Sequence, residues 1–266
     1  MGKYSVCVAL LILTACGGDD GPPTPTSPAP IPAADTCAFL GGTASTPGTP
    51  ILNGAGCSPD RSSVVLLNMR TSDGSPLGAC TGTVIAPRVV LTAAHCLDEG
   101  AGVARVWLGP PTLEIVAESF EFFPNYRFNT PGLFDVGIIV MSDDLPRTPI
   151  PILTSRDARV GETAIIAGWG RDQNDVTATL RAGSTTLTGV TDSLLQTQHA
   201  PPASSVCSGD SGGPILLSEG GLWVIGGITS ATSANVCNTG TNLYQAIRHQ
   251  SVRDFILQRV PNVLQR

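Results

Sequence analysis

Cys207-Ser208-Gly209-Asp210-Ser211-Gly212-Gly213-Pro214 is the stretch that decides the fold, and apolar residues 215–217 follow it directly. A serine among glycines suits a nucleophile, because backbone N–H groups can then converge on an oxyanion without obstruction by side chains. The same letters fit G-x-S-x-G, the strand–turn–helix elbow of α/β-hydrolases. That class needs a helix after the serine, and an acid and then a histidine further on. Pro214 and the apolar run favour a strand, and no aspartate lies between Ser211 and His249, where only Glu219, eight residues after the serine, is available. The sequence therefore argues against the lipase and esterase classes.

Two upstream segments supply the partners that a serine nucleophile needs. LTAAHC, at 91–96, contains His95, and FDVGII, at 134–139, contains Asp135. A histidine can act as general base because its pKa lies near neutrality, and a buried carboxylate fixes its tautomer. Each residue alone would more often be an ordinary core, surface or turn residue, but the three together make those interpretations improbable. We predict Ser211 as nucleophile, His95 as general base and Asp135 as the orienting carboxylate.

Short apolar segments, typical of strands, occur on both sides of a polar connection at residues 142–159. They lie at residues 64–67, 83–85, 89–91, 104–108 and 137–140, and then at 164–167, 214–217, 223–225 and 243–247. Helical spacing occurs at 251–260, where Val252, Phe255 and Ile256 recur every three or four residues. The pattern predicts an all-β chain with two β-barrels, at about 51–145 and 158–250, followed by a C-terminal helix over 251–260.

TAAHC at 92–96, the segment around Asp135 and GDSGGP at 209–214 resemble motifs of the trypsin/chymotrypsin family of serine proteases, here of a bacterial, secreted or lipoprotein type. GWG at 168–170 resembles a further landmark, and the resemblance covers roughly residues 51–260 of a protease domain at 51–266. It implies two antiparallel six-stranded barrels with the active site between them. The activity that it implies is hydrolysis of protein or peptide substrates through an acyl-enzyme on Ser211, with neither cofactor nor metal. It assigns the oxyanion-binding N–H groups to Gly209 and Ser211, and to Ser230 a hydrogen bond to Asp135.

Eight cysteines contain no C-x-x-C pair, and Cys7 and Cys16 belong to an apolar N-terminal stretch. An even number in the rest of an exported chain predicts disulfides, and six cysteines allow about 15 pairings by counting alone. The resemblance narrows this choice. It pairs Cys80 with Cys96 and Cys207 with Cys237, which leaves Cys37 with Cys57.

Ile51-Leu52-Asn53-Gly54 resembles the mature N-terminus of the family, whose freed α-amino group pairs with the aspartate before the nucleophile, here Asp210. Such a buried carboxylate is costly without a partner. Residue 50 is proline, however, and no basic residue lies at 48–50. Three explanations are open: a protease that does not require a basic residue cuts before Ile51, the true mature N-terminus lies elsewhere, or the uncut proenzyme is active by another route. We expect cleavage before Ile51 by an activating protease, with residues 37–50 as a propeptide retained through Cys37 and Cys57.

The resemblance also assigns the pocket that selects the substrate. Ser205 aligns with the base of this pocket, where an aspartate would select Arg or Lys. Thr232 and Asn242 align with wall positions, and Ser230 lies beside them. A narrowed, uncharged pocket of this kind predicts an elastase-like preference for small aliphatic residues.

Residues 1–16 carry one lysine and then a short apolar run, as in a signal peptide. Their end, Leu13-Thr14-Ala15-Cys16, resembles the bacterial lipobox and predicts lipidation of Cys16; the alternative is ordinary cleavage nearby with an incidental cysteine. Residues 17–36 hold six prolines and predict an extended linker. The chain would then be exported, as a cell-envelope lipoprotein or as a secreted protein, with membrane contact only through a lipid on Cys16.

Composition and motifs together exclude some functions and leave two rivals. The net charge is −6 and no basic run is present, which argues against a nucleic-acid partner. One rival is a catalytically silent binding protein on the protease scaffold, although all three predicted catalytic residues are present. The other is a passive surface lipoprotein, which leaves those three residues unexplained.

Overall fold

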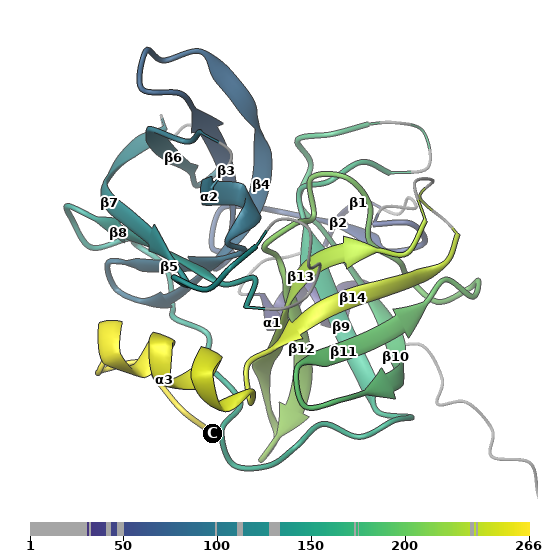
Figure 1. The fold of residues 1–266 in the computed structure, drawn as a ribbon. Helices are drawn as coiled ribbons and strands as arrows, with labels where there is room; N and C mark the ends of the chain where they lie inside the picture. Colours follow the sequence, from purple (N-terminus) through teal and green to yellow (C-terminus); the bar gives the residue numbers. More distant parts are fainter. Residues whose placement is uncertain are drawn as a thin grey trace, which may run out of the picture.

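The computed structural model describes residues 31, 33–40, 44–46, 51–98, 100–110, 114–127, 134–172, 174, 176–234, 237 and 239–266. Two antiparallel barrels stand side by side in it (Figure 1). The signal peptide, Cys16 and most of the predicted linker lie outside the described residues. No helix in the described ranges has the length and apolar character needed to cross a bilayer.

The first barrel is closed by six strands in the order β3-β4-β5-β8-β7-β6. Buried strand residues fill its interior, as in β3, where residues 64–67 leave very little surface exposed. In chain order its elements are β3 (Val64–Arg70), β4 (Pro76–Ala86), β5 (Val89–Thr92), the short helix α2 (His95–Asp98), β6 (Val103–Trp107), β7 (Ile115–Phe122) and β8 (Gly137–Met141).

The second barrel is closed by the pairing of β9 with β10, and its other neighbours follow the order β10-β11-β14-β13-β12-β9. A short strand, β2 (Ala55–Cys57), adds to the edge of β10, and β1 (Ala44–Thr46) adds to β2. The six barrel strands are β9 (Thr163–Gly168), β10 (Arg181–Val190), β11 (Leu194–Gln198), β12 (Pro214–Glu219), β13 (Leu222–Thr232) and β14 (Thr241–Ala246).

The C-terminal helix α3 (Gln250–Arg259) follows the second barrel but packs against the first (Figure 1). Its Val252, Phe255 and Ile256 are buried, as their spacing predicts. The Phe255 ring lies 5.4 Å from that of Phe123, and Arg259 stacks over Phe255 at 4.0 Å. The helix thereby ties the two barrels together.

Three disulfides join the pairs that the resemblance implied: Cys37–Cys57, Cys80–Cys96 and Cys207–Cys237. The first attaches helix α1 (Ala33–Phe39) to β2, and Leu40 is buried beside it. Helix α1 begins within the last four residues of the segment expected to be an extended linker. The folded part of the chain therefore starts earlier than the sequence pattern indicates, because this disulfide and Leu40 anchor it.

The two-barrel prediction and the terminal helix are confirmed, the helix one residue earlier than expected. Every apolar segment named above contributes to a strand. One assignment was wrong: residues 55–57 were placed with the first barrel, but they pair with β10 of the second. Strands β1, β2, β7, β10 and β11 were missed.

Candidate active site

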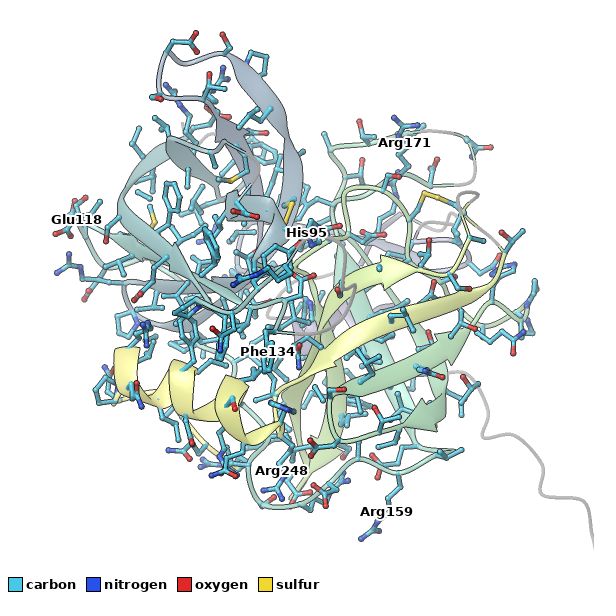
Figure 2. The ribbon with its side chains drawn as sticks, viewed as in Figure 1. His95, Glu118, Phe134, Arg159, Arg171 and Arg248 are labelled. Atoms are coloured by element: carbon cyan, nitrogen blue, oxygen red, sulfur yellow. A yellow bond between two sulfur atoms is a disulfide. The ribbon has the colours of Figure 1, made fainter. Side chains whose placement is uncertain are left out.

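His95 and Asp135 come together because of the register of two strands in the first barrel. β5 pairs with β8 with Thr92 opposite Gly137. His95 lies three residues after the end of that pairing on one strand, and Asp135 lies two residues before it on the other. Both side chains therefore leave the same end of the barrel. In Figure 2, His95 lies between the two barrels.

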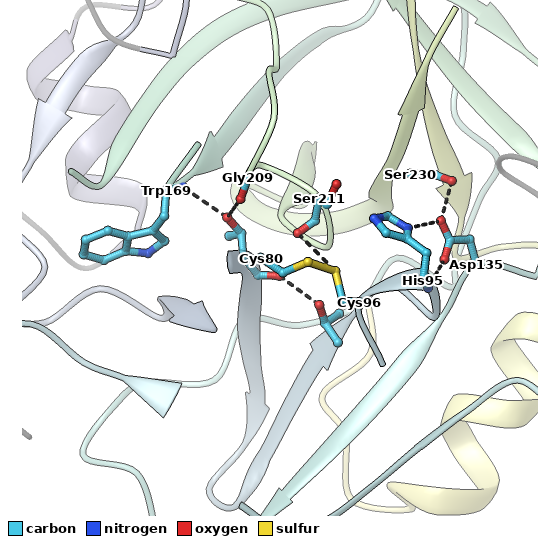
Figure 3. The surroundings of a disulfide bond; sticks show 10 residues. Cys80, His95, Cys96, Asp135, Trp169, Gly209, Ser211 and Ser230 are labelled. Atoms are coloured by element: carbon cyan, nitrogen blue, oxygen red, sulfur yellow. Dashed lines mark hydrogen bonds and ion pairs between the residues drawn. A yellow bond between two sulfur atoms is a disulfide. The ribbon is translucent and has the colours of Figure 1, made fainter. Parts of the chain in front are cut away.

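The Asp135 carboxylate accepts three hydrogen bonds that fix its position. Its Oδ2 lies 2.9 Å from Nδ1 of His95, and its Oδ1 accepts the main-chain N–H of His95 at 2.9 Å. The Ser230 hydroxyl, from the second barrel, donates to Oδ2 at 2.5 Å (Figure 3). The Asp135 side chain is only 2% exposed, whereas that of His95 is 20% exposed. This geometry suits a buried carboxylate that orients an imidazole, while the imidazole itself remains partly exposed to solvent.

The main chain at Asp135 is held from the second barrel as well. Its N–H donates to the side-chain oxygen of Gln245, which is fully buried, at 3.2 Å. The preceding residue, Phe134, has a positive φ of 58° and stacks on Phe123 at 4.7 Å. Strain at a non-glycine residue persists only where the surroundings determine the backbone. The loop is therefore fixed on both sides of the carboxylate.

Ser211 and His95 line one hollow of about 200 Å³ between the barrels, and Figure 3 shows the Ser211 side chain beside the imidazole. The carbonyl of Ser211 accepts the N–H of Thr81 at 2.8 Å, which ties the serine to the first barrel. The other residues that line the hollow are Met69, Leu77, Gly78, Ala79, Cys80 and Cys96.

The loop at 207–214, which we call the oxyanion loop, is a tight turn held by hydrogen bonds of its backbone. The N–H groups of Asp210, Gly212 and Gly213 donate to carbonyls. Within the described part of the chain, the N–H groups of Gly209 and Ser211 have no acceptor. Gly209 has a φ of 96°, and a Cβ there would lie 2.9 Å from the Cα of Gly170, so glycine is required. Two adjacent free donors of this kind are what an oxyanion needs.

Thr81 links this loop to two neighbouring segments. Its hydroxyl donates to the carbonyl of Gly209 at 2.8 Å and accepts the N–H of Trp169 at 3.0 Å. Thr81 is fully buried. Because the Gly209 carbonyl is held in this way, the peptide that follows the oxyanion-loop glycine has a fixed orientation.

Asp210 is fully buried and faces the second barrel. Its Oδ1 accepts the N–H of Gly170 and its Oδ2 the N–H of Cys207, both at 2.8 Å. Burial raises the pKa of Asp210 to about 6, while the two N–H groups and the charge of Arg181 act in the opposite direction. The carboxyl is thus held in the position from which it could receive a further cation.

Ile51 is buried in the second barrel among residues that include Leu153 and Val206. The carbonyl of Leu52 accepts the N–H of Ser205 at 3.1 Å. The segment that was expected to become the mature N-terminus is therefore docked beside the pocket residues. In the described residues no ion pair with Asp210 is present, and Ile51 offers an amide in an uncut chain.

Of the residues assigned to the substrate pocket, Asn242 contacts Ser205 and lies opposite Thr232 in the pairing of β13 with β14. Asn242, which is 1% exposed, donates to the Ser205 hydroxyl at 2.9 Å and to Thr197 at 3.0 Å. Thr197 in turn bonds Tyr244 at 3.0 Å. Thr232 is half-buried, and its hydroxyl donates to the carbonyl of Ala234 at 2.6 Å. The Asn242 amide thereby reaches across to Ser205, where a glycine would leave space.

One group of ligand-type atoms lies at this site but does not form a metal centre. The sulfur atoms of Cys80 and Cys96 lie close to a ring nitrogen of His95. The two sulfurs are joined in a disulfide, so they offer no thiolates to a metal.

Four residues that hold the site were missed from the sequence: Thr81, Asp172, Arg181 and Gln245. Thr81 follows a predicted disulfide cysteine, but nothing in the sequence marks its hydroxyl as a bridge. Gln245 is read as a strand residue. The roles of Thr81 and Gln245 depend on contacts between segments more than 80 residues apart, which spacing cannot reveal. Asp172 and Arg181 lie only nine residues apart, but nothing in the sequence marks them as a buried ion pair.

Comparison with known proteins agrees with the two-barrel architecture and the motifs. The family model described as "Trypsin" matches residues 51–256. Phenoloxidase-activating factor 3 of Holotrichia diomphalia is 29% identical over 200 residues, which span 59% of this chain and 56% of that protein. Brachyurin of Leptuca pugilator is 29% identical over 191 residues, which span 60% of this chain and 79% of that one.

A solved structure titled HL collagenase superposes with a TM-score of 0.63 at 23% identity, and it covers 75% of this chain and 93% of its own. It supports the fold. The family match extends over most of the chain and includes all three motifs of the site. The chain belongs to the trypsin family of serine endopeptidases.

Proposed function

We propose that the protein hydrolyses peptide bonds with Ser211 as nucleophile, His95 as general base and Asp135 as its orienting carboxylate. The observation that carries this proposal is the buried Asp135 carboxylate, which accepts Nδ1 of His95 at 2.9 Å while Ser211 lines the same hollow as the imidazole. With Nδ1–H bound in this way, Nε2 is the nitrogen that can take a proton.

The reaction proceeds in two halves. The Ser211 hydroxyl attacks the scissile carbonyl carbon as its proton passes to His95, and the resulting oxyanion accepts the N–H groups of Gly209 and Ser211. The C–N bond then breaks, and His95 returns the proton to the leaving amine. Water attacks the acyl-enzyme by the same route and releases the carboxylic acid.

Steady-state hydrolysis of peptide substrates tests this assignment. Ser211→Ala and His95→Ala should each lower kcat by about 10⁴-fold or more, with little change in KM, because both groups act in the transition state. Asp135→Asn should lower it by about 10⁴-fold, because the imidazole loses its tautomer. A catalytically silent binding protein would show no hydrolysis in the wild type, and this result would refute the proposal.

The primary specificity that we propose is for small uncharged residues. Ser205 brings no charge to the pocket base, and the Asn242 side chain occupies space beside it. Matched substrates with Ala, Val or Arg before the scissile bond test this directly. Faster cleavage after Arg would refute it. Asn242→Gly should widen the pocket and improve kcat/KM for larger residues, with Ser205→Ala as the control that keeps the volume.

We also propose that an activating protease cuts before Ile51, which would free an α-amino group to pair with Asp210. Support comes from the docked position of residues 51–52 beside Ser205 and from the fully buried Asp210 carboxyl. N-terminal sequencing of active material should find a chain that begins at Ile51. If such material never contains that terminus, the assignment of the cut is wrong.

For localisation, we propose export and lipidation at Cys16, on the basis of the LTAC sequence; disulfide bonds agree with an oxidising compartment. Detergent-phase partitioning of wild type and Cys16→Ser tests the anchor. The wild type should enter the detergent phase and the variant the aqueous phase, whereas equal partitioning would show that the cysteine is incidental.

A further inference from the structure

Arg181 is an arginine buried at the start of β10, beside the oxyanion loop. Its side chain is 4% exposed, and its Nη2 pairs with Oδ2 of Asp172 at 3.0 Å, where the Asp172 side chain is 7% exposed. Its Nη1 donates to the carbonyls of Gly170 and Val176, both at 3.1 Å. Asp172 also accepts the N–H groups of Asn174 and Val176. The guanidinium thus binds residues 170, 172 and 176, which all follow Trp169, and fixes their positions.

Gly170 connects this charge to Asp210. The carbonyl of Gly170 accepts from Arg181, and its N–H donates to the Asp210 carboxylate at 2.8 Å. A Cβ at Gly170 would lie 2.6 Å from the Asp210 carboxyl carbon, so the two residues are in close contact. The charge of Arg181 favours the ionised form of Asp210 against its burial. It is a cation that the uncut chain already contains.

The same segment supports the oxyanion loop directly. Gly170 packs against Gly209, where an added Cβ would lie 2.9 Å from the Gly170 Cα. The next residue, Arg171, donates its main-chain N–H to the carbonyl of Ser208 at 2.9 Å. A displacement of residues 170–171 would therefore move the peptide that carries the Gly209 N–H.

We propose that Arg181 is a positioning residue that holds the oxyanion loop in its working geometry before any cut at Ile51, so that the uncut chain has basal peptidase activity. The inference rests on the proposed function of Ser211 and His95. It accounts for a chain with proline at residue 50 and no basic residue at 48–50, since activity would not depend wholly on cleavage there. Cleavage would add a second cation beside Asp210 and would raise the activity further.

The test compares uncut and cut enzyme in parallel. The uncut form is the full chain, verified as one polypeptide after reduction. The cut form comes from a Pro50→Arg chain treated with immobilised trypsin and verified by N-terminal sequencing to begin at Ile51. Arg181→Gln removes the charge, and Arg181→Lys keeps it. Arg156→Gln is the matched control, because Arg156 pairs with Glu162 and Glu219 on the same barrel.

In the uncut form, we expect Arg181→Gln to lower kcat by about 100-fold with KM nearly unchanged, which is the size of a lost oxyanion donor. Arg181→Lys should lose about tenfold or less, because the charge remains while the forked contacts are lost. In the cut form, Arg181→Gln and Arg181→Lys should each lower kcat by about threefold or less, since the α-amino group of Ile51 then faces Asp210. Arg156→Gln should leave kcat unchanged in both the uncut and the cut form.

Two results would overturn the inference: an inactive uncut wild type, or an equal loss in the cut and uncut forms of Arg181→Gln, which would indicate a general structural role. If Arg181→Gln does not fold, Arg181→Lys takes its place in the test: a larger loss of kcat in the uncut form than in the cut form supports the inference, and an equal loss overturns it. Failure of the proposed function would look different, because the cut wild type itself would then not hydrolyse any peptide.

Discussion

Single side chains that bridge the two barrels should have large effects on stability and activity, because both partners of each bridge are buried. Thr81 is the clearest case: its one hydroxyl satisfies a carbonyl of the oxyanion loop and an N–H beside Trp169. Removing a partner from a buried polar group costs about 1–3 kcal/mol, more than the net contribution of the bond itself.

Thr81→Val should therefore lower the free energy of unfolding by about 2 kcal/mol, because it leaves the Gly209 carbonyl and the Trp169 N–H unpaired at nearly constant volume. It should also lower kcat, because the Gly209 peptide is released. Chemical denaturation and peptide hydrolysis measure the two effects. Thr81→Ser is the control and should restore most of both. A Val variant as stable and active as wild type would contradict the bridging role.

Asp210 makes the stability of the uncut chain depend on pH in an unusual direction. Its pKa is raised from 3.8 to about 6, so the folded protein binds this proton more tightly than the unfolded one. The resulting stabilisation is fully present below pH 3.8 and is lost as the pH rises through about 6. The shift corresponds to about 3 kcal/mol.

Asp210→Asn should therefore gain stability relative to its parent by about 2 kcal/mol between pH 4 and pH 7, measured by denaturation of uncut chains that both carry Ser211→Ala. The charged neighbour of Asp210 is Arg181, which stays protonated throughout. Tyr244 stays neutral, because burial raises its pKa. The difference between the two proteins thus isolates Asp210. A pH-independent difference would show that its pKa is not raised.

At the scale of elements, helix α1 and β2 show how a propeptide can remain after cleavage. The Cys37–Cys57 disulfide crosses the expected cut before Ile51, Leu40 and Cys37 are buried, and α1 contacts β10 of the second barrel. The Phe39 ring also lies 5.2 Å from that of Trp223 on β13. Covalent and apolar contacts both hold the segment.

In a chain cut before Ile51, residues 37–50 should stay attached under non-reducing conditions and separate after reduction, as read by intact mass. The double variant Cys37→Ser, Cys57→Ser should release the segment without reduction. Before any cut it should also be less stable by about 3 kcal/mol, as expected for a loop of this size. Intact mass that shows release from the disulfide-bonded protein would refute the tether.

Strands could be predicted from the sequence where both of their faces are buried, because such strands are continuous runs of apolar residues. β3, β9 and β12 are runs of apolar residues buried on both faces, and each was predicted. β7 was missed because it is largely exposed and Glu118 and Glu121 interrupt its apolar residues, and β10 because Gly, Ser and Thr make up most of it. Neither segment contains the continuous apolar run by which the other strands were predicted, and pairing with neighbouring strands defines both.

The same limit applied to the site. His95, Asp135 and Ser211 sit in contiguous motifs and could be read directly, whereas Arg181 and Thr81 could not. Their partners are brought close by strand register and loop packing, which a single sequence does not display. The Ile51–Asp210 pair was read from the motif and stays a prediction.

At the scale of the molecule, neither barrel contains a complete site. The first barrel supplies His95 and Asp135, and the second supplies Ser211, Ser230 and the Gln245 amide that holds the Asp135 main chain. Helix α3 crosses back to the first barrel, and Trp169 of the second packs on Trp107 of the first at 5.2 Å. A change that separates the two barrels should therefore abolish activity even while each barrel remains folded.

The most direct test of the central claim is the intact mass of the cut protein after incubation with a fluorophosphonate, followed by peptide mapping. A serine reacts with this reagent only when a neighbouring base activates it. We predict one adduct, on Ser211, in the wild type, and none in His95→Ala over the same time. An unmodified wild type, or an adduct on another residue with Ser211 intact, would contradict the account.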